Sequence, residues 1–330
     1  MSVPGVFCAA ALLLALLPVW LPLAALLDLA RGRTRLPVAR LLMFALGWTL
    51  LESGAMVAVA ALWLVGRSHD RPIHYALQRW WAARLMATLR VTTGIRVEAS
   101  GLESFEPSPV IMLCRHASLA DSLVSAWVVT TLAGLHPRYV LKRELLFDPC
   151  LDIVGNRLPN HFLDRGAADS GPELAALTAL TTDLDSGDVA IIFPEGTRAS
   201  AAKRTRALER LTERDPLRAQ RLAGLRHLLP PRPAGAVALL AGHPTADVVI
   251  AWHTGFDGLD TFSGILRHLA RPPTPVRFVA RRVARGDVAT GNDFIAWLDD
   301  AWLQADLAVQ RMLGADHVVS SPGSADERPT

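Results

Sequence analysis

The chain has very little cysteine and almost no lysine for its 330 residues. Cys8, Cys114 and Cys150 are far apart and form no C-x-x-C pair, which argues against a structural zinc site and against a disulfide-stapled secreted scaffold. The basic side chains are nearly all arginine, with Lys142 and Lys203 as the only lysines, and the net charge is just +3. Because no stretch combines a dense basic run with aromatic residues, no nucleic-acid partner is expected.

Two catalytic signatures are also missing. The sequence contains no G-x-S-x-G elbow and no H-E-x-x-H motif, which disfavours a hydrolase with a serine nucleophile and gives no sign of a metal site. Apolar residues make up 51% of the chain and charged residues 20%, with a mean hydropathy of +0.27. This composition is too apolar for a disordered chain and too charged for a polytopic transporter. It predicts a globular domain with a membrane segment, and the basic excess suits an anionic membrane surface.

The N-terminal part supplies two apolar segments that are long enough to cross a bilayer core, for which about 20 residues suffice. Residues 1–27 carry no charged side chain, and residues 41–66 are interrupted only by Glu52. The first segment has no basic start and is too long for a signal peptide. Pro18 and Pro22 lie in its middle, and we expect a bend there because each proline removes a helix hydrogen bond.

Arginine-rich stretches flank the second apolar segment on both sides. Four arginines lie within 31–40 and five more within 67–90. Basic residues stay on the cytoplasmic side of a membrane, so two full spans would place one of these groups on the wrong side. We therefore predict that residues 1–66 form a membrane-embedded helical hairpin that enters from the cytoplasmic face, with two complete spans as the alternative. A carboxylate at mid-depth is costly in lipid, so Glu52 is expected to be protonated or to face a partner helix.

Residues 67–94 are predicted to form an amphipathic interfacial helix. Its Trp80 and Trp81 fit the headgroup depth of a membrane, and packing of the same pair into the protein core is the alternative. Over residues 95–315 short β-like runs alternate with helical stretches, which predicts an α/β domain with a mainly parallel sheet flanked by helices. The tail 316–330 has the composition of a disordered segment. The predicted strands are 95–99, 109–114, 138–142, 161–164, 189–193, 247–252 and 275–281, and the predicted helices are about 118–133, 171–186, 201–228 and 291–313.

The segment RHASLAD places a histidine at the end of a predicted strand. His116 follows the run 109–114, and Asp121 stands five residues after it, near the start of the next predicted helix. Ligands of open α/β sheets bind at the carboxyl ends of strands. An acid at this spacing can hold one imidazole nitrogen and leave the other free to take a proton from a hydroxyl. Taken alone, the pattern is better explained by a buried core histidine and a helix-capping aspartate.

The segment FPEGTR supplies a second polar strand end. It follows the apolar run of the predicted strand 189–193 and turns at Pro194 and Gly196. The Arg198 guanidinium beside exposed backbone N–H groups suits a phosphate. An ion pair between Glu195 and Arg198 that holds the turn explains the same residues equally well.

Together, HASLAD and FPEGTR resemble the motifs of the phospholipid/glycerol acyltransferase family, and most closely those of its 1-acylglycerol-3-phosphate acyltransferases. The family's His-x4-Asp motif matches His116 and Asp121, and its F-P-E-G-T-R motif is present unaltered. HFLDR at 161–165 is similar to the family's intermediate motif, and LKREL, which contains Lys142, is similar to its lysine segment.

Two later segments extend the resemblance over nearly all of the predicted α/β domain. LLPPRPAGAVALL at 228–240 and FIAWLDDAWLQAD at 294–306 are similar to segments of the eukaryotic-like, lysocardiolipin-type branch of the family. Three positions depart from the family pattern: Arg115 stands where asparagine is usual, Ala236 replaces an aromatic residue and Ala305 replaces a lysine. These departures bear on acceptor and acyl preference rather than on the reaction.

The resemblance implies a membrane-bound O-acyltransferase that moves an acyl chain from acyl-CoA or acyl carrier protein to the sn-2 hydroxyl of lysophosphatidic acid, giving phosphatidic acid. It implies that His116 acts as the base, that Asp121 orients its imidazole and that Ser118 is a helix cap rather than a nucleophile. No metal and no bound cofactor are expected, since the thioester is a substrate. The implied substrate-binding residues supply positive charge for the acceptor phosphate, or in the case of Glu195 orient that cluster or a glycerol hydroxyl: Lys142, Arg165, Glu195, Gly196, Thr197 and Arg198.

The expected partners are membrane lipids, a lysophospholipid acceptor and the thioester donor. The expected location is the cytoplasmic face of a membrane, which in a bacterium is the inner membrane. Two alternatives stay open: a reacylase or transacylase acting on lysocardiolipin or another lysophospholipid, and a catalytically silent scaffold that binds anionic lipid. The intact motifs disfavour the scaffold.

Overall fold

The computed structural model describes residues 2–118, 120–164, 170–256, 259 and 261–320. Its centre is a seven-stranded sheet in the order β1-β7-β6-β2-β5-β3-β4, and each predicted strand is present within a few residues of its expected bounds. The strands are β1 (Val97–Ser100), β2 (Val110–Cys114), β3 (His136–Lys142), β4 (His161–Leu163), β5 (Asp188–Ile192), β6 (Asp247–Thr254) and β7 (Val276–Val283).

The sheet is mainly parallel, as predicted. β6 and β7 pair antiparallel, and every other neighbouring pair is parallel. Consequently β2, β3, β4, β5 and β6 run in one direction, and β1 and β7 run in the other. The carboxyl ends of the five strands β2 to β6 therefore meet at one edge of the sheet. This is where open α/β sheets hold their ligands.

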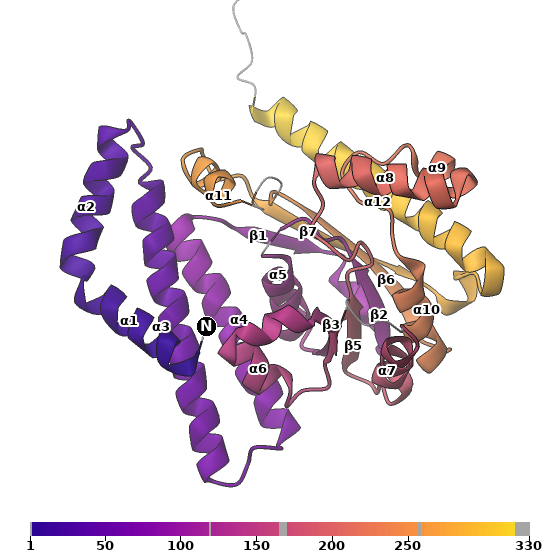
Figure 1. The fold of residues 1–330 in the computed structure, drawn as a ribbon, viewed down its shortest axis with the longest axis horizontal. Helices are drawn as coiled ribbons and strands as arrows, with labels where there is room; N and C mark the ends of the chain where they lie inside the picture. Colours follow the sequence, from indigo (N-terminus) through magenta and orange to yellow (C-terminus); the bar gives the residue numbers. More distant parts are fainter. Residues whose placement is uncertain (1, 119, 165–169, 257–258, 260, 321–330) are drawn as a thin grey trace, which may run out of the picture.

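Helices cover both faces of the sheet, and a further group of N-terminal helices stands at its side (Figure 1). Side chains of α7, α9, α10 and α12 pack on one face, and those of α4, α5 and α11 pack on the other. The helices are α1 (Val3–Ala15), α2 (Leu17–Ala30), α3 (Pro37–Leu64), α4 (Arg71–Thr93), α5 (Asp121–Trp127), α6 (Pro149–Gly155), α7 (Gly171–Thr182), α8 (Ala201–Arg214), α9 (Pro216–Leu222), α10 (Pro233–Gly242), α11 (Phe262–Leu269) and α12 (Phe294–Ser320).

Alternate residues of the central strand β2 pack on opposite faces of the sheet. Ile111 and Leu113 belong to the core beneath α7, α10 and α12, and Val110 and Met112 belong to the core beneath α4 and α5. All four side chains are fully buried. This two-sided burial anchors the strand and therefore the position of the polar residues that follow its end.

The helix predicted over 201–228 is two helices, which is a correction to the sequence analysis. α8 ends before Asp215, and α9 begins at Pro216, whose ring and missing N–H stop the helix from continuing. Asp215 accepts the Arg218 backbone N–H at 3.0 Å and so caps α9. The break turns α9 onto the core beside α12 (Figure 1).

The last helix is longer than predicted. α12 continues to Ser320, into the segment 316–330 for which we expected disorder. Its apolar stripe reaches Met312 and Leu313, which still pack against the core. Tertiary packing close to the predicted end therefore supports a helix that the polar composition of the tail did not indicate.

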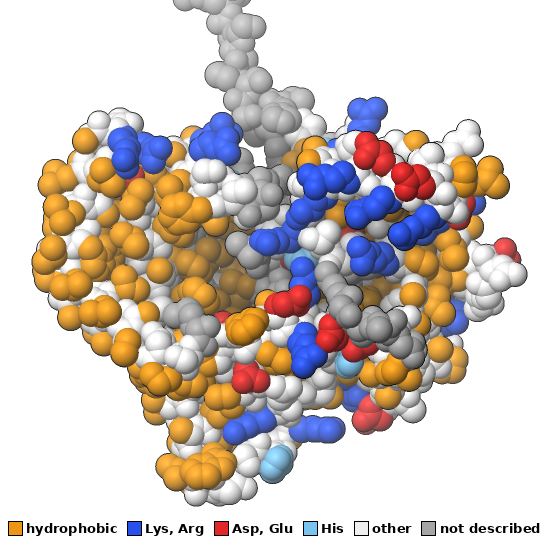
Figure 2. All heavy atoms as spheres, in the orientation of Figure 1, with side chains coloured by type: hydrophobic (Ala, Val, Ile, Leu, Met, Phe, Trp, Pro, Cys, Tyr) orange, Lys and Arg blue, Asp and Glu red, His pale blue; other side chains and the backbone are white. Residues whose placement is uncertain are grey.

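The N-terminal helices expose apolar side chains over much of their surface. α1 and α2 meet at 73° next to Leu16, just ahead of Pro18, in keeping with the bend expected in the first apolar segment. α3 is continuous through the second segment, and it alone among the described helices is long and apolar enough by itself to cross a membrane. Leu23, Leu26 and Trp63 are each more than half exposed, and Figure 2 shows apolar side chains covering this part of the molecule.

Glu52 faces α4 from the middle of α3. Its Oε1 accepts hydrogen bonds from the indole nitrogens of Trp48 at 3.0 Å and Trp81 at 3.2 Å, so the expectation of a partner helix is correct. The two tryptophans of α4 differ in burial, and the membrane depth expected for them stays a prediction. Trp81 turns inward to Glu52, whereas Trp80 is 40% exposed.

Candidate active site

His116 and Asp121 lie together beyond the carboxyl end of β2. The chain turns after the strand, so that Asp121, the first residue of α5, meets the imidazole. His116 Nδ1 lies 2.8 Å from Asp121 Oδ2, and the ring packs against Phe193 with centroids 4.8 Å apart. The Asp121 side chain is buried, while that of His116 is 15% exposed and lines a cavity. The imidazole therefore keeps its Nε2 for a ligand in that cavity.

Asp121 is held by several donors at once. Oδ2 accepts the backbone N–H groups of Ala117 at 2.5 Å and Ser118 at 2.8 Å, and His253 Nε2 at the end of β6 lies 3.1 Å from Oδ1. Burial acts to raise the pKa of Asp121, but the charge interaction with His253 and the hydrogen bond from His116 hold that pKa well below its usual range. The carboxylate therefore stays ionised and orients the imidazole with Nδ1 protonated.

Ser118 lies just ahead of α5 and not at its N-cap position, which is Ala120. The Ser118 hydroxyl donates to Asp121 Oδ1 and accepts the Ala120 backbone N–H at 3.0 Å. The prediction that Ser118 caps the helix is thus corrected to a role in holding Asp121. With its hydroxyl engaged on both sides, Ser118 is not arranged as a nucleophile.

Glu195 joins three segments of the chain beneath the site. One carboxylate oxygen accepts the backbone N–H of His116 and the other that of Leu229, both at 2.9 Å. The side chain is only 2% exposed, and burial raises the pKa of Glu195 to about 8. We expected Glu195 to orient the phosphate-binding cluster or a glycerol hydroxyl, or to pair with Arg198. The structure instead places it under the site, where it fixes the backbone of His116.

Basic side chains line the cavity next to His116. Its volume is about 430 Å³, within the range of about 300–1,000 Å³ usual for small-molecule sites. Lys142 from the end of β3 and Arg198 from beyond β5 both line it, and Arg232 from the start of α10 adds a third cation. Figure 2 shows lysine and arginine side chains gathered beside a hollow in this face. An anionic group entering the cavity thus meets positive charge from three segments.

The remaining predicted binding residues do not all line the cavity. Gly196 lines the cavity and Thr197 does not. Gly196 has φ +70°, and a Cβ atom there would lie 3.3 Å from the Arg232 side chain, so the turn needs glycine for both its conformation and its close approach. Arg165 lies outside the described residues, and its place in the set stays a prediction.

Two residues of the site were not predicted. Arg232 belongs to the segment 228–240, whose resemblance to a family segment gave no reason to select the arginine. His253 lies near the end of the predicted strand 247–252, and the strand-end criterion that selected His116 applied to it as well. Among the residues that the structure describes, no group of three or more His, Cys, Asp and Glu side chains is placed to hold a metal ion.

Known proteins share the part of the chain that carries this geometry. A profile of the family described as "Acyltransferase" matches residues 96–251, a range that holds the His116–Asp121 pair and FPEGTR. Residues 96–251 form a domain of the acyltransferase family. This acyltransferase domain includes Lys142, Arg198 and Arg232, while His253 lies just beyond it.

Two individual proteins are similar to this chain. The 1-acyl-sn-glycerol-3-phosphate acyltransferase of Pseudomonas aeruginosa is 35% identical over 130 residues, which make up 38% of this chain and 46% of the relative. The match thus spans less than half of that protein. The crystal structure of the 1-acyl-sn-glycerophosphate acyltransferase PlsC from Thermotoga maritima superposes with a TM-score of 0.45 at 15% identity, covering 83% of this chain and 98% of that one.

Proposed function

We propose that the protein transfers an acyl chain from acyl-CoA or acyl carrier protein to the sn-2 hydroxyl of lysophosphatidic acid. The proposal is carried by one cavity that is lined both by His116, held by Asp121, and by the cations Lys142, Arg198 and Arg232. A base for a hydroxyl and positive charge for a phosphate suit the two reactive features of this acceptor. The name of the Pseudomonas aeruginosa relative gives the same kind of acceptor, 1-acyl-sn-glycerol-3-phosphate.

The proposed mechanism uses His116 Nε2 as the base. While Asp121 holds Nδ1, Nε2 takes the proton of the acceptor hydroxyl as its oxygen attacks the thioester carbonyl. The C–O bond forms, the resulting tetrahedral intermediate loses the thiolate, and the imidazolium returns its proton to the sulfur. Backbone N–H groups near the strand ends stabilise the oxyanion. No acyl-enzyme is required, in keeping with the engaged hydroxyl of Ser118.

The Arg198→Ala and Arg232→Ala variants are expected to weaken use of the phosphorylated acceptor. Each lost charge-assisted contact costs about 1.5–3 kcal/mol, or roughly ten- to a hundredfold in kcat/KM for lysophosphatidic acid. Steady-state kinetics with each substrate varied in turn should show the KM of the acceptor rising more than that of the thioester. Arg206→Ala, on the exposed face of α8, is the matched control and should change neither constant. Variants that weaken only thioester use would remove the phosphate assignment.

A thioester-release assay with a panel of lysophospholipids tests the acceptor itself. A phosphomonoester carries nearly two negative charges, so a cluster of cations favours it over a diester headgroup. Lysophosphatidic acid should therefore be used more efficiently than lysophosphatidylcholine or lysophosphatidylethanolamine. Better use of the zwitterionic acceptors, or of lysocardiolipin, would replace the proposal with the reacylase alternative.

We also propose that α1, α2 and α3 attach the protein to the cytoplasmic face of a membrane without crossing it. Support comes from their exposed apolar side chains and from the 73° angle between α1 and α2. The arginines of the α2–α3 connection, Arg31, Arg33 and Arg35, then stay on the side of the acyltransferase domain.

Cysteine labelling should find position 34 inaccessible from outside intact cells. Thr34 is exposed, and Cys8 is the exposed native cysteine, so Thr34→Cys in a Cys8→Ser background gives one reactive thiol. A membrane-impermeant maleimide should label it only after the membrane is opened. Labelling in intact cells would show that the connection is translocated and would favour two spans.

A further inference from the structure

A second cavity, mostly apolar, lies between the N-terminal helices and the sheet domain. Its volume is about 460 Å³. Ser122, Leu141 and Leu145 line both this cavity and the one that contains His116, so the two are neighbours with a common wall. A chain bound at the reaction centre therefore lies next to this second cavity. The apolar wall from α3 and α4 is formed by Leu41, Phe44, Trp48, Leu77, Trp81, Leu85 and Leu89.

Most polar groups on the wall of this second cavity already have partners in the protein. The Tyr139 hydroxyl and the Ser125 hydroxyl lie 3.0 Å apart and share a hydrogen bond. Asp148 accepts the Cys150 backbone N–H at 2.9 Å at the start of α6, and Asn160 accepts the Tyr139 backbone N–H at 2.8 Å. The wall therefore follows the rule that buried polar groups are paired, and exceptions to the rule need an explanation.

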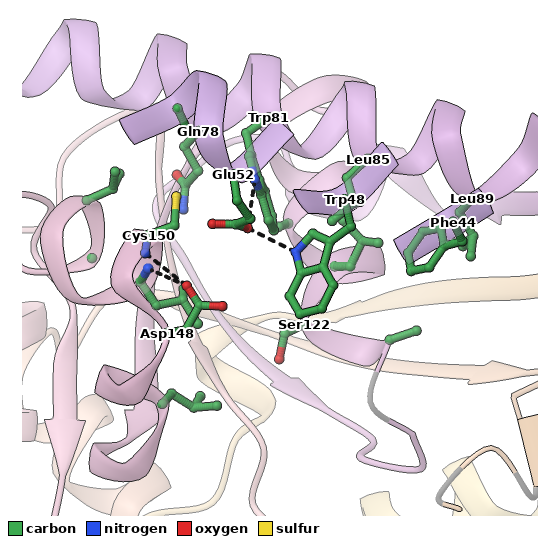
Figure 3. Close-up of a pocket in the computed structure, with 18 of the residues that line it drawn as sticks. Phe44, Trp48, Glu52, Gln78, Trp81, Leu85, Leu89, Ser122, Asp148 and Cys150 are labelled. Carbon is green, nitrogen blue, oxygen red and sulfur yellow. Dashed lines mark hydrogen bonds between the residues drawn. The ribbon is translucent and has the colours of Figure 1, made fainter. Parts of the chain in front are cut away.

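Two buried oxygen atoms on the wall are exceptions among the described residues. Oε1 of Glu52 accepts from both indoles. Glu52 has no further hydrogen-bond donor except the Cys150 thiol, and Gln78 Oε1 has no hydrogen-bond partner. Glu52 is 3% exposed, and its carboxyl group points into the cavity (Figure 3). The Cys150 thiol, which is a weak donor, lies on the same side of the cavity. A polar spot is thus built into an otherwise apolar space.

We infer that this cavity binds a fatty-acyl chain that carries a hydroxyl group, and that Glu52 and Gln78 bind the hydroxyl. The methylene groups fill the apolar volume, while the O–H of the substrate supplies a full-strength donor for one of these two oxygens. Burial raises the pKa of the Glu52 carboxyl to about 7, so near neutral pH it exists in both protonation states. Protonated Glu52 donates to the substrate hydroxyl, which then donates to Gln78 Oε1, whereas ionised Glu52 accepts from the substrate hydroxyl directly.

The inference deepens the proposed acyl transfer and rests on it for the route from His116 into the cavity. Such a chain has two sources: the acyl group of the thioester, or the chain already present on the lysophospholipid. Both share the chemistry that Glu52 and Gln78 recognise. The experiment therefore has one arm for each source, with the hydroxyl on one substrate at a time.

The kinetic test compares substrates of equal chain length that differ only by a hydroxyl at carbon 3, at mid-chain or at the chain end. The hydroxyl is placed either on the acyl group of the thioester or on the chain of the lysophospholipid. For the substrate whose chain enters the cavity, the wild type should prefer one hydroxylated isomer over the unsubstituted chain by at least tenfold in kcat/KM. Glu52→Leu should remove this preference while unsubstituted chains remain substrates, and Glu52→Gln should retain part of it. Gln78→Leu should weaken the preference for the hydroxylated chain. Leu85→Ala, which changes an apolar part of the same wall, should leave that preference unchanged. The absence of any preference in both arms, or its persistence in Glu52→Leu, would overturn the inference.

A binding measurement separates failure of this inference from failure of the proposed reaction. The purified His116→Ala protein lacks the base but keeps the second cavity. A radiolabelled hydroxy fatty acid is displaced either by the same acid without label or by its unsubstituted counterpart. The unsubstituted acid should be needed at a concentration at least ten times higher than the hydroxy acid. This difference should vanish in His116→Ala/Glu52→Leu. A wild type that transfers no acyl group yet shows this difference would refute the reaction only. Equal displacement by both acids would refute hydroxyl recognition even in an active enzyme. Thermal melting checks that each variant is folded. If the Glu52→Leu protein is not folded, Glu52→Gln takes its place in this test.

Discussion

His116→Ala is expected to lower the rate of acyl transfer by about 10²–10⁴-fold while the protein remains folded. The loss follows from removing the only group in the proposed mechanism that takes the acceptor proton. Folding should survive because the imidazole lies at the edge of a cavity and is partly exposed. Thiol release from the thioester, followed with lysophosphatidic acid as acceptor, measures the effect.

Asp121→Asn is the companion variant that tests the geometry of the pair. An amide can present its NH₂ group to His116, which favours the wrong imidazole tautomer and leaves Nε2 protonated at neutral pH. Activity should therefore fall severely although the shape of the side chain is kept. Near-normal turnover by a folded His116→Ala protein would remove the mechanism proposed above.

The meeting of His116, Lys142 and Arg198 was predictable because it depends on a regular property of parallel sheets. Apolar runs marked the strands β2, β3 and β5, and each run was followed by one of these polar residues. Parallel strands bring their carboxyl ends to the same edge, so side chains far apart in sequence were expected in one place. The apolar pattern thus gave the sheet and the strand ends, whereas Lys142 was singled out by the resemblance to the acyltransferase family.

The role of Glu195 was not predictable because it depends on a segment without periodic structure. Leu229, its second partner, lies between α9 and α10 and comes near β5 only through the packing of α9 on the core. The same holds for Arg115, which takes the place of a usual asparagine. It is 1% exposed and donates to the backbone carbonyl of His253, a contact between strand ends that no spacing in the sequence indicates.

The polar spot in the apolar cavity was likewise beyond sequence reasoning. Glu52 was recognised as costly in an apolar helix, and its need for a partner followed from electrostatics alone. Its two indole donors come from different helices, α3 and α4. Glu52 Oε2 faces a cavity because α3 and α4 form one wall of that cavity beside the acyltransferase domain. Helix periodicity does not specify which helix packs against which part of a sheet.

Glu195→Ala is expected to destabilise the protein by several kcal/mol and to abolish activity together with that loss. The substitution leaves the buried backbone N–H of Leu229 and the partly buried one of His116 without an acceptor, and an unsatisfied buried group costs about 1–3 kcal/mol. Urea unfolding measures the change in the free energy of unfolding. Glu213→Ala, at an exposed position of α8, is the control and should be neutral. An unchanged unfolding midpoint in Glu195→Ala would show that the carboxylate does not hold the site together.

Glu195→Gln removes the ionisation of this residue and, because the glutamine NH₂ group cannot accept, also one of its two backbone hydrogen bonds; the pH dependence of stability isolates the ionisation. The pKa of Glu195 is raised in the folded protein from its ordinary 4.5 to about 8 because the side chain is buried. Between these two pH values the folded state keeps a proton that the unfolded state has lost, so this contribution to stability is present below about pH 4.5 and is lost as the pH rises to about 8. The glutamine amide cannot ionise, so the fall in unfolding free energy from pH 5 to pH 8 should be smaller in Glu195→Gln than in the wild type. Parallel pH profiles for the two proteins would mean that Glu195 is ionised throughout this range, held by its two backbone donors and the nearby Arg115 guanidinium.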